Sequence, residues 1–173
     1  ALRARKDKVI STLTGGLATL ARRRNVTIIR GDARFVNSTT LEVKGPGSAG
    51  SQQVTFDHCI LASGSRPARI PAFDIGSPRV MDSTSALELA DVPESLLVVG
   101  GGYIGLEMGT VYAELGSKVS VVELTDTLLP GADRDLVKPL QQRLEKLFEK
   151  IHLRTKVVKI EDTGKAVKVH FEG

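Results

Sequence analysis

The sequence contains little cysteine and few aromatic residues. Its 173 residues include one cysteine, two tyrosines and no tryptophan. A single cysteine excludes a disulfide bond within the chain. That residue, Cys59, lies in the apolar run FDHCILASG. The run predicts a buried thiol in a strand rather than a redox group, because reactive cysteines need exposed, electropositive surroundings.

Long hydrophobic runs are also absent. No apolar stretch approaches the roughly 18 residues of a membrane-spanning helix, so we expect no membrane association. The first residues, ALRARKDKVI, are basic, but no apolar core of a signal peptide follows them. The missing initial Met suggests a processed or excised chain. The overall composition, with 41% hydrophobic and 25% charged residues, is ordinary for a globular protein.

The positive charge of the chain is confined to one segment. Residues 1–34 contain nine Lys or Arg and two acidic residues, whereas the rest of the chain has a net charge of −3. No aromatic side chains alternate with these basic residues to stack on bases. We therefore interpret the segment as a solvated helix face or a contact with an acidic neighbour. A nucleic-acid-binding surface is the weaker alternative, and we expect no nucleic-acid partner.

The first part of the chain predicts a helix followed by strands. Apolar residues recur at helical spacing over residues 3–24. NVTIIRGDARF predicts a buried strand that ends at Gly31, and HCILAS predicts a strand covered on both faces. Between them, ARFVN, TTLEVKG and QQVTFD alternate between apolar and polar residues. With the intervening GPGSAGS turn, they predict a small antiparallel meander.

The second part predicts a parallel α/β sheet. A proline-containing link holds a short helix, DSTSALELA, with Asp82 or Ser83 as its cap. After it we expect three strands that alternate with two helices, as in a sheet with right-handed crossovers. They are strand 96–100, helix 103–115, strand 118–123, helix 134–149 and strand 152–160. The predicted domains are residues 1–66, a linker at 67–95, and residues 96–173.

A glycine motif joins the first predicted strand of this sheet to its helix. Gly100, Gly102 and Gly105 form G-x-G-x-x-G, which alone is weak evidence but here lies within a strand–helix–strand unit. Gly100 permits a tight turn, Gly102 lets a pyrophosphate approach the backbone, and Gly105 permits close packing of helix on strand. The helix start adds free N–H groups and the positive end of a dipole. The pattern predicts a dinucleotide site.

An acidic residue indicates which dinucleotide is bound. Glu123 ends the next strand, 18 residues after Gly105. A carboxylate at this position accepts hydrogen bonds from both hydroxyls of the adenosine ribose and repels a 2′-phosphate. The following residues, LTDTLLPGAD, contain no Lys or Arg to receive that phosphate. The sequence therefore favours NAD over NADP.

Two further side chains lie near the glycine turn. Tyr103 and Glu107 are four residues apart, so both can project from one face of the helix. Either residue can also have a purely structural role. Tyr103 would then pack in the core, and Glu107 would lie on a solvated face.

Several motifs, in this order, carry a family resemblance. VTIIRGDARF, ILASGSRP, DSTSALEL, VPESLLVVGGGYIGLEMGTVYAELGSKVSVVE and LLPGADRDLV resemble dihydrolipoamide dehydrogenases of the bacterial, pyruvate dehydrogenase complex type. These enzymes are a branch of the flavin disulfide oxidoreductase family. The resemblance covers nearly the whole chain. It implies an α/β fold of two partial Rossmann-like lobes, which bind FAD and NAD, with parallel sheets and the small antiparallel meander.

The resemblance also implies roles for particular residues. Tyr103 and Glu107 match positions beside the nicotinamide and the flavin. Val157 matches a position where the backbone meets the adenine of NAD. The implied NAD-binding residues are Gly100, Gly101, Gly102, Tyr103, Ile104, Gly105, Leu106, Glu107, Glu123 and Val157. The implied FAD-binding residues are Ala33, Ser63, Gly64 and Ser65, with Ser63 in place of the usual Thr.

The resemblance implies an enzyme that moves electrons from dihydrolipoamide through a disulfide and FAD to NAD. Such an enzyme serves cell redox homeostasis as a cytoplasmic homodimer, and its substrate is carried on the lipoyl domain of a 2-oxo acid dehydrogenase complex. The family's cysteine pair and catalytic His are missing, and no metal site is indicated. We therefore expect a central fragment without activity of its own. A glutathione- or mercuric-type reductase and a non-catalytic NAD-binding or interaction module are the alternatives.

Overall fold

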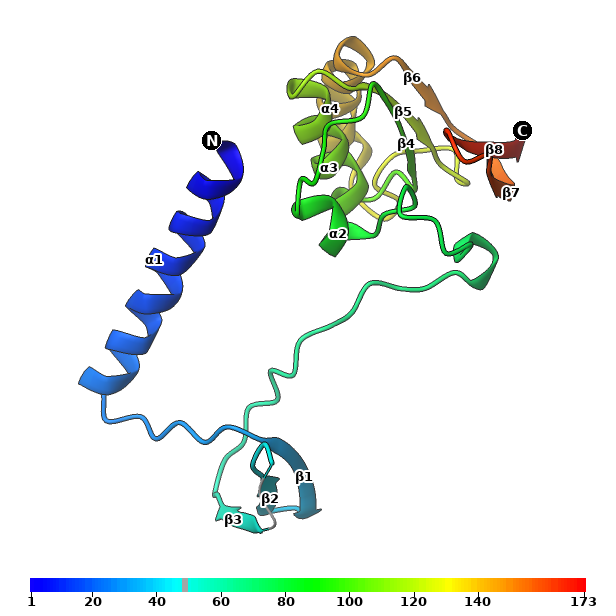
Figure 1. The fold of residues 1–173 in the computed structure, drawn as a ribbon. Helices are drawn as coiled ribbons and strands as arrows, with labels where there is room; N and C mark the ends of the chain where they lie inside the picture. The colour runs from blue at the N-terminus through cyan, green and yellow to red at the C-terminus, as the bar shows by residue number, and fades with distance from the viewer. Residues whose placement is uncertain (48–49) are drawn as a thin grey trace. The chain divides into compact units, whose positions relative to one another are not determined.

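The chain forms two compact units (Figure 1). A computed structural model describes residues 1–47 and 50–173. The first unit comprises Ala1–Ser65 and the second Arg66–Gly173. Residues 67–95, which the sequence assigns to a linker, lie in the second unit. The turn predicted at residues 45–51 includes positions 48 and 49, which lie outside the described residues.

The first unit begins with a long amphipathic helix, α1 (Leu2–Arg23), which confirms the helix expected over residues 3–24. Its apolar residues at helical spacing are all exposed; they are Val9, Leu13, Leu17 and Leu20. The helix ends where Asn25 adopts a positive φ of 54°. Basic residues in its last turn, Arg22 and Arg23, complement the negative end of the helix dipole.

The predicted antiparallel meander is confirmed. Its strands are β1 (Asp32–Asn37), β2 (Thr40–Lys44) and β3 (Ser51–Thr55), and they pair in that order. Phe35 of β1 and Val54 of β3 both stand opposite Leu41 of β2, so the apolar positions share one face.

Two strands predicted in the first unit do not form. Residues 26–30 and 58–63 have no regular secondary structure. Ile28 is 61% exposed and Ile60 is 92% exposed, so neither apolar run is buried. The prediction of a buried thiol is also wrong, because Cys59 is exposed. A strand is held by its neighbours in a sheet, and the described residues place no paired strand beside either segment.

The second unit contains a parallel sheet, as predicted. Its strands β4 (Ser95–Val99), β5 (Lys118–Val122) and β6 (Lys150–His152) pair in that order. Helix α3 (Tyr103–Glu114) connects β4 to β5, and α4 (Arg134–Leu147) connects β5 to β6. The mixed α/β class, with a parallel sheet and an antiparallel meander, is confirmed.

Side chains from both faces of the parallel sheet are buried. Leu96, Val98, Val119 and Val121 pack into the cluster that includes residues of α3 and α4. Leu97 and Val122 instead join a second cluster on the opposite face. This division follows from the period of two along a strand. It explains why apolar residues follow one another at Leu96–Val99 of β4 and at Val121 and Val122 of β5.

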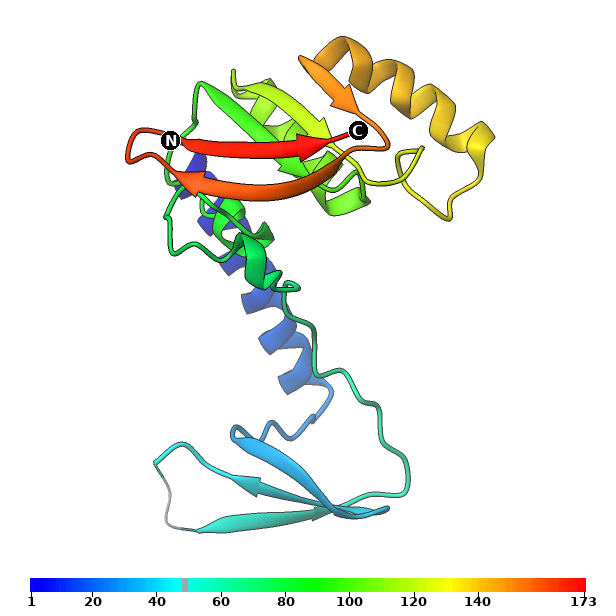
Figure 2. The same ribbon diagram turned by 90° about the vertical axis from the view of Figure 1, so that its right-hand side faces the viewer.

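An antiparallel hairpin supplies the second cluster. Its strands are β7 (Lys156–Asp162) and β8 (Val167–Glu172), the orange and red strands of Figure 2. The single strand predicted over residues 152–160 is therefore wrong, because β6 and β7 belong to different sheets. The break lies at Arg154, whose positive φ of 54° redirects the chain.

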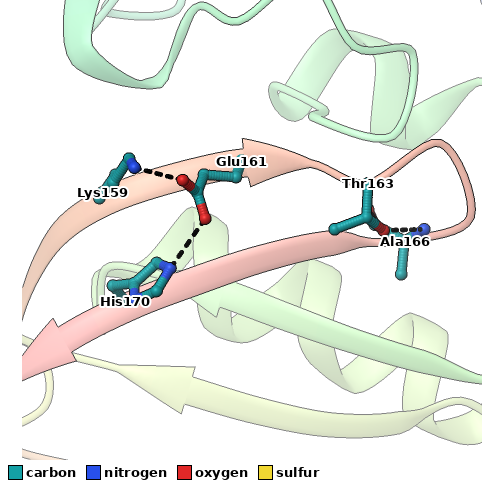
Figure 3. A network of polar contacts seen from close by, with 5 residues as sticks. All are labelled: Lys159, Glu161, Thr163, Ala166 and His170. Carbon is teal, nitrogen blue, oxygen red and sulfur yellow. Dashed lines mark hydrogen bonds and ion pairs between the residues drawn. The ribbon is translucent and has the colours of Figure 1, made fainter.

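The hairpin carries a polar network on its surface (Figure 3). The carboxylate of Glu161 contacts Lys159 on the same strand, and the ring of His170 on β8 lies 3.0 Å from its Oε2. A hydrogen bond from Lys159, and to a smaller extent one from His170, lowers the pKa of Glu161 to about 2. Thr163 and Ala166 close the turn between the strands with reciprocal hydrogen bonds.

The connection that leads into the parallel sheet contains two short helices. One is the 3-10 helix η1 (Pro71–Phe73), which contacts β7. The other is α2 (Ser83–Leu87), capped by Asp82 as predicted, since its side chain accepts a hydrogen bond from the Ser85 N–H. No helix within residues 1–47 or 50–173 combines the length and hydrophobicity that crossing a membrane requires.

Candidate dinucleotide-binding site

The glycine turn between β4 and α3 is a tight backbone structure. Gly100 adopts φ +107°, which side chains disfavour, and its N–H donates to the carbonyl of Val122 on β5 at 2.8 Å. At Gly105 an added Cβ would lie 2.5 Å from the Gly100 oxygen and 2.9 Å from Val98 Cγ1. Only glycine at this position allows α3 to lie so close to β4.

The space in front of Gly102 is open. An added Cβ there would meet no atom within 4 Å. Gly102 is also the N-cap of α3, and no described side chain caps this helix end. The first backbone N–H groups of the helix are therefore available to an external acceptor. Together with the helix dipole they suit an anion such as a pyrophosphate.

Glu123 lies directly behind this turn. It follows β5 and is only 7% exposed. Its Oε2 accepts a hydrogen bond from the Gly101 N–H at 2.6 Å. Its Oε1 accepts two more, from the Thr125 N–H at 2.7 Å and the Thr125 hydroxyl at 2.8 Å. The carboxylate therefore ties the glycine turn to the chain that follows β5.

These contacts favour the charged form of Glu123. Burial would raise its pKa, but hydrogen bonds from Thr125 and Gly101 outweigh that effect and hold the pKa below its ordinary value. At neutral pH the site thus presents a buried negative charge. Such a charge accepts hydrogen bonds from hydroxyl groups and repels a phosphate.

The loop after β5 packs onto the glycine turn. The Leu129 N–H donates to the Gly101 carbonyl at 2.9 Å, and Leu128 is fully buried. An added Cβ at Gly101 would lie 2.7 Å from Leu128 Cδ2 and 3.2 Å from Glu123 Cβ and Cγ. Gly101, a variable position of the G-x-G-x-x-G pattern, is therefore closely packed here, as Gly105 is, whereas the space at Gly102 is open.

The connection between β6 and β7 flanks Glu123 on another side. The Thr155 N–H donates to the Glu123 carbonyl at 2.9 Å, and the Arg154 N–H donates to the Thr125 carbonyl at 2.7 Å. The Arg154 guanidinium lies 3.6 Å from Asp126, and both side chains are largely exposed. Val157 is buried against Val122 in the second cluster.

Sequence reasoning missed Thr125 and Arg154. The segment that directly follows Glu123 contains no Lys or Arg, but Arg154 comes from the more distant connection after β6. The carboxyl ends of parallel strands meet at one edge of a sheet, so residues after β6 also reach this site. That rule is the signal that could have found Arg154. The role of Thr125 depends on a side-chain hydrogen bond that no pattern predicts.

The predicted residues of the helix start are exposed around the turn. Tyr103 is 67% exposed, so the alternative that it packs in the core is wrong. Ile104 and Glu107 are also exposed, whereas Leu106 is buried in the core beneath α3. The Leu106 N–H donates to the Gly102 carbonyl at 3.0 Å, so neither the backbone N–H nor the side chain of Leu106 is open to a nucleotide.

The residues predicted to contact a flavin all lie in the first unit. Ala33 is on β1, and the Ser63–Ser65 segment ends the unit. All of them are exposed, and Gly64 adopts a positive φ of 75°. No group of three potential metal ligands occurs within residues 1–47 and 50–173.

Comparison with known proteins finds relatives that match nearly the whole chain. The chain is 48% identical over 172 residues to a dihydrolipoyl dehydrogenase of Vibrio parahaemolyticus, a match that covers 99% of this chain and 36% of the relative. It is 38% identical over 98% of its length to a leghemoglobin reductase of Vigna unguiculata, of which it covers 32%. Dihydrolipoyl dehydrogenase is another name for dihydrolipoamide dehydrogenase.

A solved structure shares the fold. The HOCl-induced flavoprotein disulfide reductase RclA of Escherichia coli, solved as its Cu(II) complex, superposes with a TM-score of 0.82 at 32% identity. The match covers 98% of this chain and 38% of that one.

The chain spans about a third of the length of the curated relatives it matches. A family model described as pyridine nucleotide-disulphide oxidoreductase matches residues 1–173. The chain therefore belongs to the pyridine nucleotide-disulphide oxidoreductase family.

Proposed function

We propose that this chain provides the NAD-binding region, and part of the FAD-binding region, of a dihydrolipoyl dehydrogenase. The observation that carries the proposal is the 48% identity over 99% of the chain to a dihydrolipoyl dehydrogenase. The geometry of Glu123 and the glycine turn supports it, because an open helix start lies next to a buried carboxylate. The enzyme's cofactors, FAD and NAD, supply the redox chemistry.

In this proposal the glycine turn and the residues next to it contact different parts of NAD. The N–H groups at the start of α3, from Tyr103 to Gly105, face the pyrophosphate, and Gly102 leaves room for it, whereas the Leu106 N–H donates to the Gly102 carbonyl. Glu123 accepts a hydrogen bond from the adenosine ribose, and the backbone near Val157 lies at the adenine. These assignments follow the family pattern, and the free helix start is consistent with them.

Tyr103 and Glu107 would lie on the side of the nicotinamide. They are four residues apart on α3, and both are exposed, so both side chains can turn toward a bound cofactor. The Tyr103 ring would cover the nicotinamide subsite, and the Glu107 carboxylate would orient the ring of the cofactor.

The first unit would contribute to FAD binding. The backbone at Ala33 would meet the adenine of FAD, and Ser63, Gly64 and Ser65 would contact the cofactor where the chain leaves the first unit. The predicted domains, residues 1–66 and 96–173 with a linker at 67–95, describe these two roles. The boundary of the first compact unit at Ser65 supports the first of them.

We further propose dihydrolipoamide on a lipoyl domain as the substrate of the whole enzyme. We also propose a homodimeric, cytoplasmic protein serving a 2-oxo acid dehydrogenase complex such as pyruvate dehydrogenase. The name of the relatives supports the substrate. This chain has a single cysteine, so alone it cannot form the disulfide that receives the electrons.

Binding and activity of the purified 173-residue chain test the proposal. We expect calorimetry to detect binding of NAD⁺, and we expect no lipoamide-dependent turnover of NADH. Turnover by the chain alone would contradict the need for a cysteine pair. Absence of NAD⁺ binding by a folded chain would contradict the proposed function of the site.

A different flavin disulfide reductase is the second candidate. The observation in its favour is the structural match to the E. coli disulfide reductase at 32% identity. The higher identity to dihydrolipoyl dehydrogenases favours the first candidate. Reductases of glutathione or mercuric type favour NADPH, so a preference for NADPH would support the second candidate.

A further inference from the structure

The carboxylate of Glu123 is almost fully engaged by the protein itself. An ionised carboxylate offers about four acceptor positions, two on each oxygen. Thr125 occupies both positions on Oε1, with its N–H at 2.7 Å and its hydroxyl at 2.8 Å. Gly101 occupies one position on Oε2, at 2.6 Å. One position, on Oε2, remains for a donor from outside the protein.

Thr125 is the only residue within residues 1–47 and 50–173 whose side chain donates to Glu123. Its hydroxyl also lies 2.9 Å from the Thr127 carbonyl, but a hydroxyl carries a single hydrogen. The charged carboxylate is the stronger acceptor of the two. The hydroxyl therefore donates to Oε1 of Glu123, and the Thr127 carbonyl is only the alternative acceptor for the same hydrogen.

We propose that Thr125 is a positioning residue for nucleotide binding, because it holds Oε1 of Glu123 and leaves Oε2 as the oxygen that receives a ribose hydroxyl. The inference rests on the proposed NAD site and refines it. The carboxylate then takes one ribose hydroxyl, rather than the two expected from the sequence. The oxygen that receives it is the one already bound to the glycine turn.

The test uses four forms of the 173-residue chain. Thr125→Val removes the hydroxyl and keeps the backbone N–H and the side-chain shape. Thr125→Ser keeps the hydroxyl and should rescue binding. Thr127→Val is the matched control, because the Thr127 hydroxyl lies in the same loop and donates to the Leu128 carbonyl at 3.0 Å instead of to Glu123. If Thr125→Val fails to fold, Thr125→Ala removes the same hydroxyl.

Calorimetry with NAD⁺ gives the first measurement. We expect Thr125→Val to raise the Kd for NAD⁺ about 3- to 10-fold, in the range of one lost hydrogen bond. Thr125→Ser and Thr127→Val should stay within about twofold of the parent chain. Unchanged affinity in Thr125→Val, or an equal loss in Thr127→Val, would overturn the proposal.

The pH dependence separates positioning from a merely structural role. Without the hydroxyl the Glu123 carboxylate is less stabilised, so its pKa rises toward the ordinary value. NAD⁺ binding should then weaken at a higher pH in Thr125→Val than in the parent chain or in Thr127→Val. Coincident pH profiles would overturn the proposal.

A measurement without nucleotide distinguishes the two possible failures. The ¹³C resonance of the Glu123 carboxyl, followed by NMR against pH, reports the contact in the free protein. If the parent chain does not bind NAD⁺, the proposed function fails, and the role of Thr125 in binding fails with it. A higher titration midpoint in Thr125→Val would still show that Thr125 holds the carboxylate, and equal midpoints would refute that as well.

Discussion

Substitution by alanine at two glycines of the same turn should impair two different properties, folding stability at Gly105 and nucleotide binding at Gly102. At Gly105, the added Cβ would lie 2.5 Å from the Gly100 oxygen, a backbone atom that cannot rotate away. At Gly102, the Cβ would enter open space, and the residue has an ordinary φ of −77°. We therefore predict a loss of folding stability for Gly105→Ala and a loss of nucleotide binding for Gly102→Ala.

The magnitude for Gly105→Ala follows from overpacking. Forcing a methyl group into a packed contact costs about 1–3 kcal/mol, and the backbone clash favours the upper part of that range. With a urea m-value of about 1.5 kcal/mol/M, the unfolding midpoint should fall by about 1–2 M. Gly102→Ala should lower stability by only about 0.5–1 kcal/mol, the cost of alanine at an N-cap.

Tyrosine fluorescence is a suitable probe of unfolding. Both tyrosines, Tyr103 and Tyr112, lie in the second unit, so their signal reports that unit alone. Calorimetry with NAD⁺ completes the comparison, and Gly102→Ala should weaken binding at least about tenfold. A midpoint for Gly105→Ala equal to that of the parent chain would refute the packing argument. Unchanged NAD⁺ affinity in Gly102→Ala would refute the assignment of the pyrophosphate to this turn.

Three further predictions concern other parts of the chain. Tyr112→Phe removes a buried hydroxyl that donates to the Ala86 carbonyl of α2 at 2.9 Å, and the Leu89 N–H still donates to that carbonyl, so the free energy of unfolding should fall by about 0.5–1.5 kcal/mol; a change within experimental error would contradict this role. Hydrogen bonds from Lys159 and His170 lower the pKa of Glu161 from 4.5 to about 2, so its contribution to stability is complete above about pH 4.5 and is lost as the pH falls toward 2. The difference in urea midpoint between the parent chain and Glu161→Gln should therefore shrink between about pH 5 and pH 2.5, and a constant difference would refute the network. Cys59 is exposed, so Ellman's reagent should modify one thiol per chain without denaturant, and modification only after unfolding would show that it is buried.

The sequence predicted the parts of the fold that are determined locally. Helix α1, the meander and the β4–α3–β5 unit all follow from period and turn residues, and the capping role of Asp82 follows from residue type. Each of these elements makes its contacts with neighbours close in the chain. Patterns of apolar residues record such contacts directly.

The wrong predictions concern contacts between distant segments. The apolar runs at residues 26–30 and 58–63 suit buried strands, yet burial requires partner strands that the described residues do not supply. The division of residues 152–160 between two sheets depends on Arg154, a residue type that does not predict a positive φ. Local composition could not reveal either outcome.

In the candidate site, too, the local features could be predicted from the sequence and the contacts between loops could not. Gly100, Gly102 and Gly105 could be identified from spacing, and Glu123 from its distance to them. The contact of Thr125 with Glu123 and the approach of Arg154 to Asp126 could not, because both depend on how the loops after β5 and β6 fold back. Site chemistry at strand ends becomes predictable only once the strand order is known.

The central claim is that the buried carboxylate behind the glycine turn selects NAD. The most direct test is calorimetry of NAD⁺ and NADP⁺ with the purified 173-residue chain at one pH and ionic strength. We predict that NAD⁺ binds at least about tenfold more tightly, because in the proposed site Glu123 would accept a ribose hydroxyl and would repel a 2′-phosphate. Equal affinities, or tighter binding of NADP⁺, would contradict this claim.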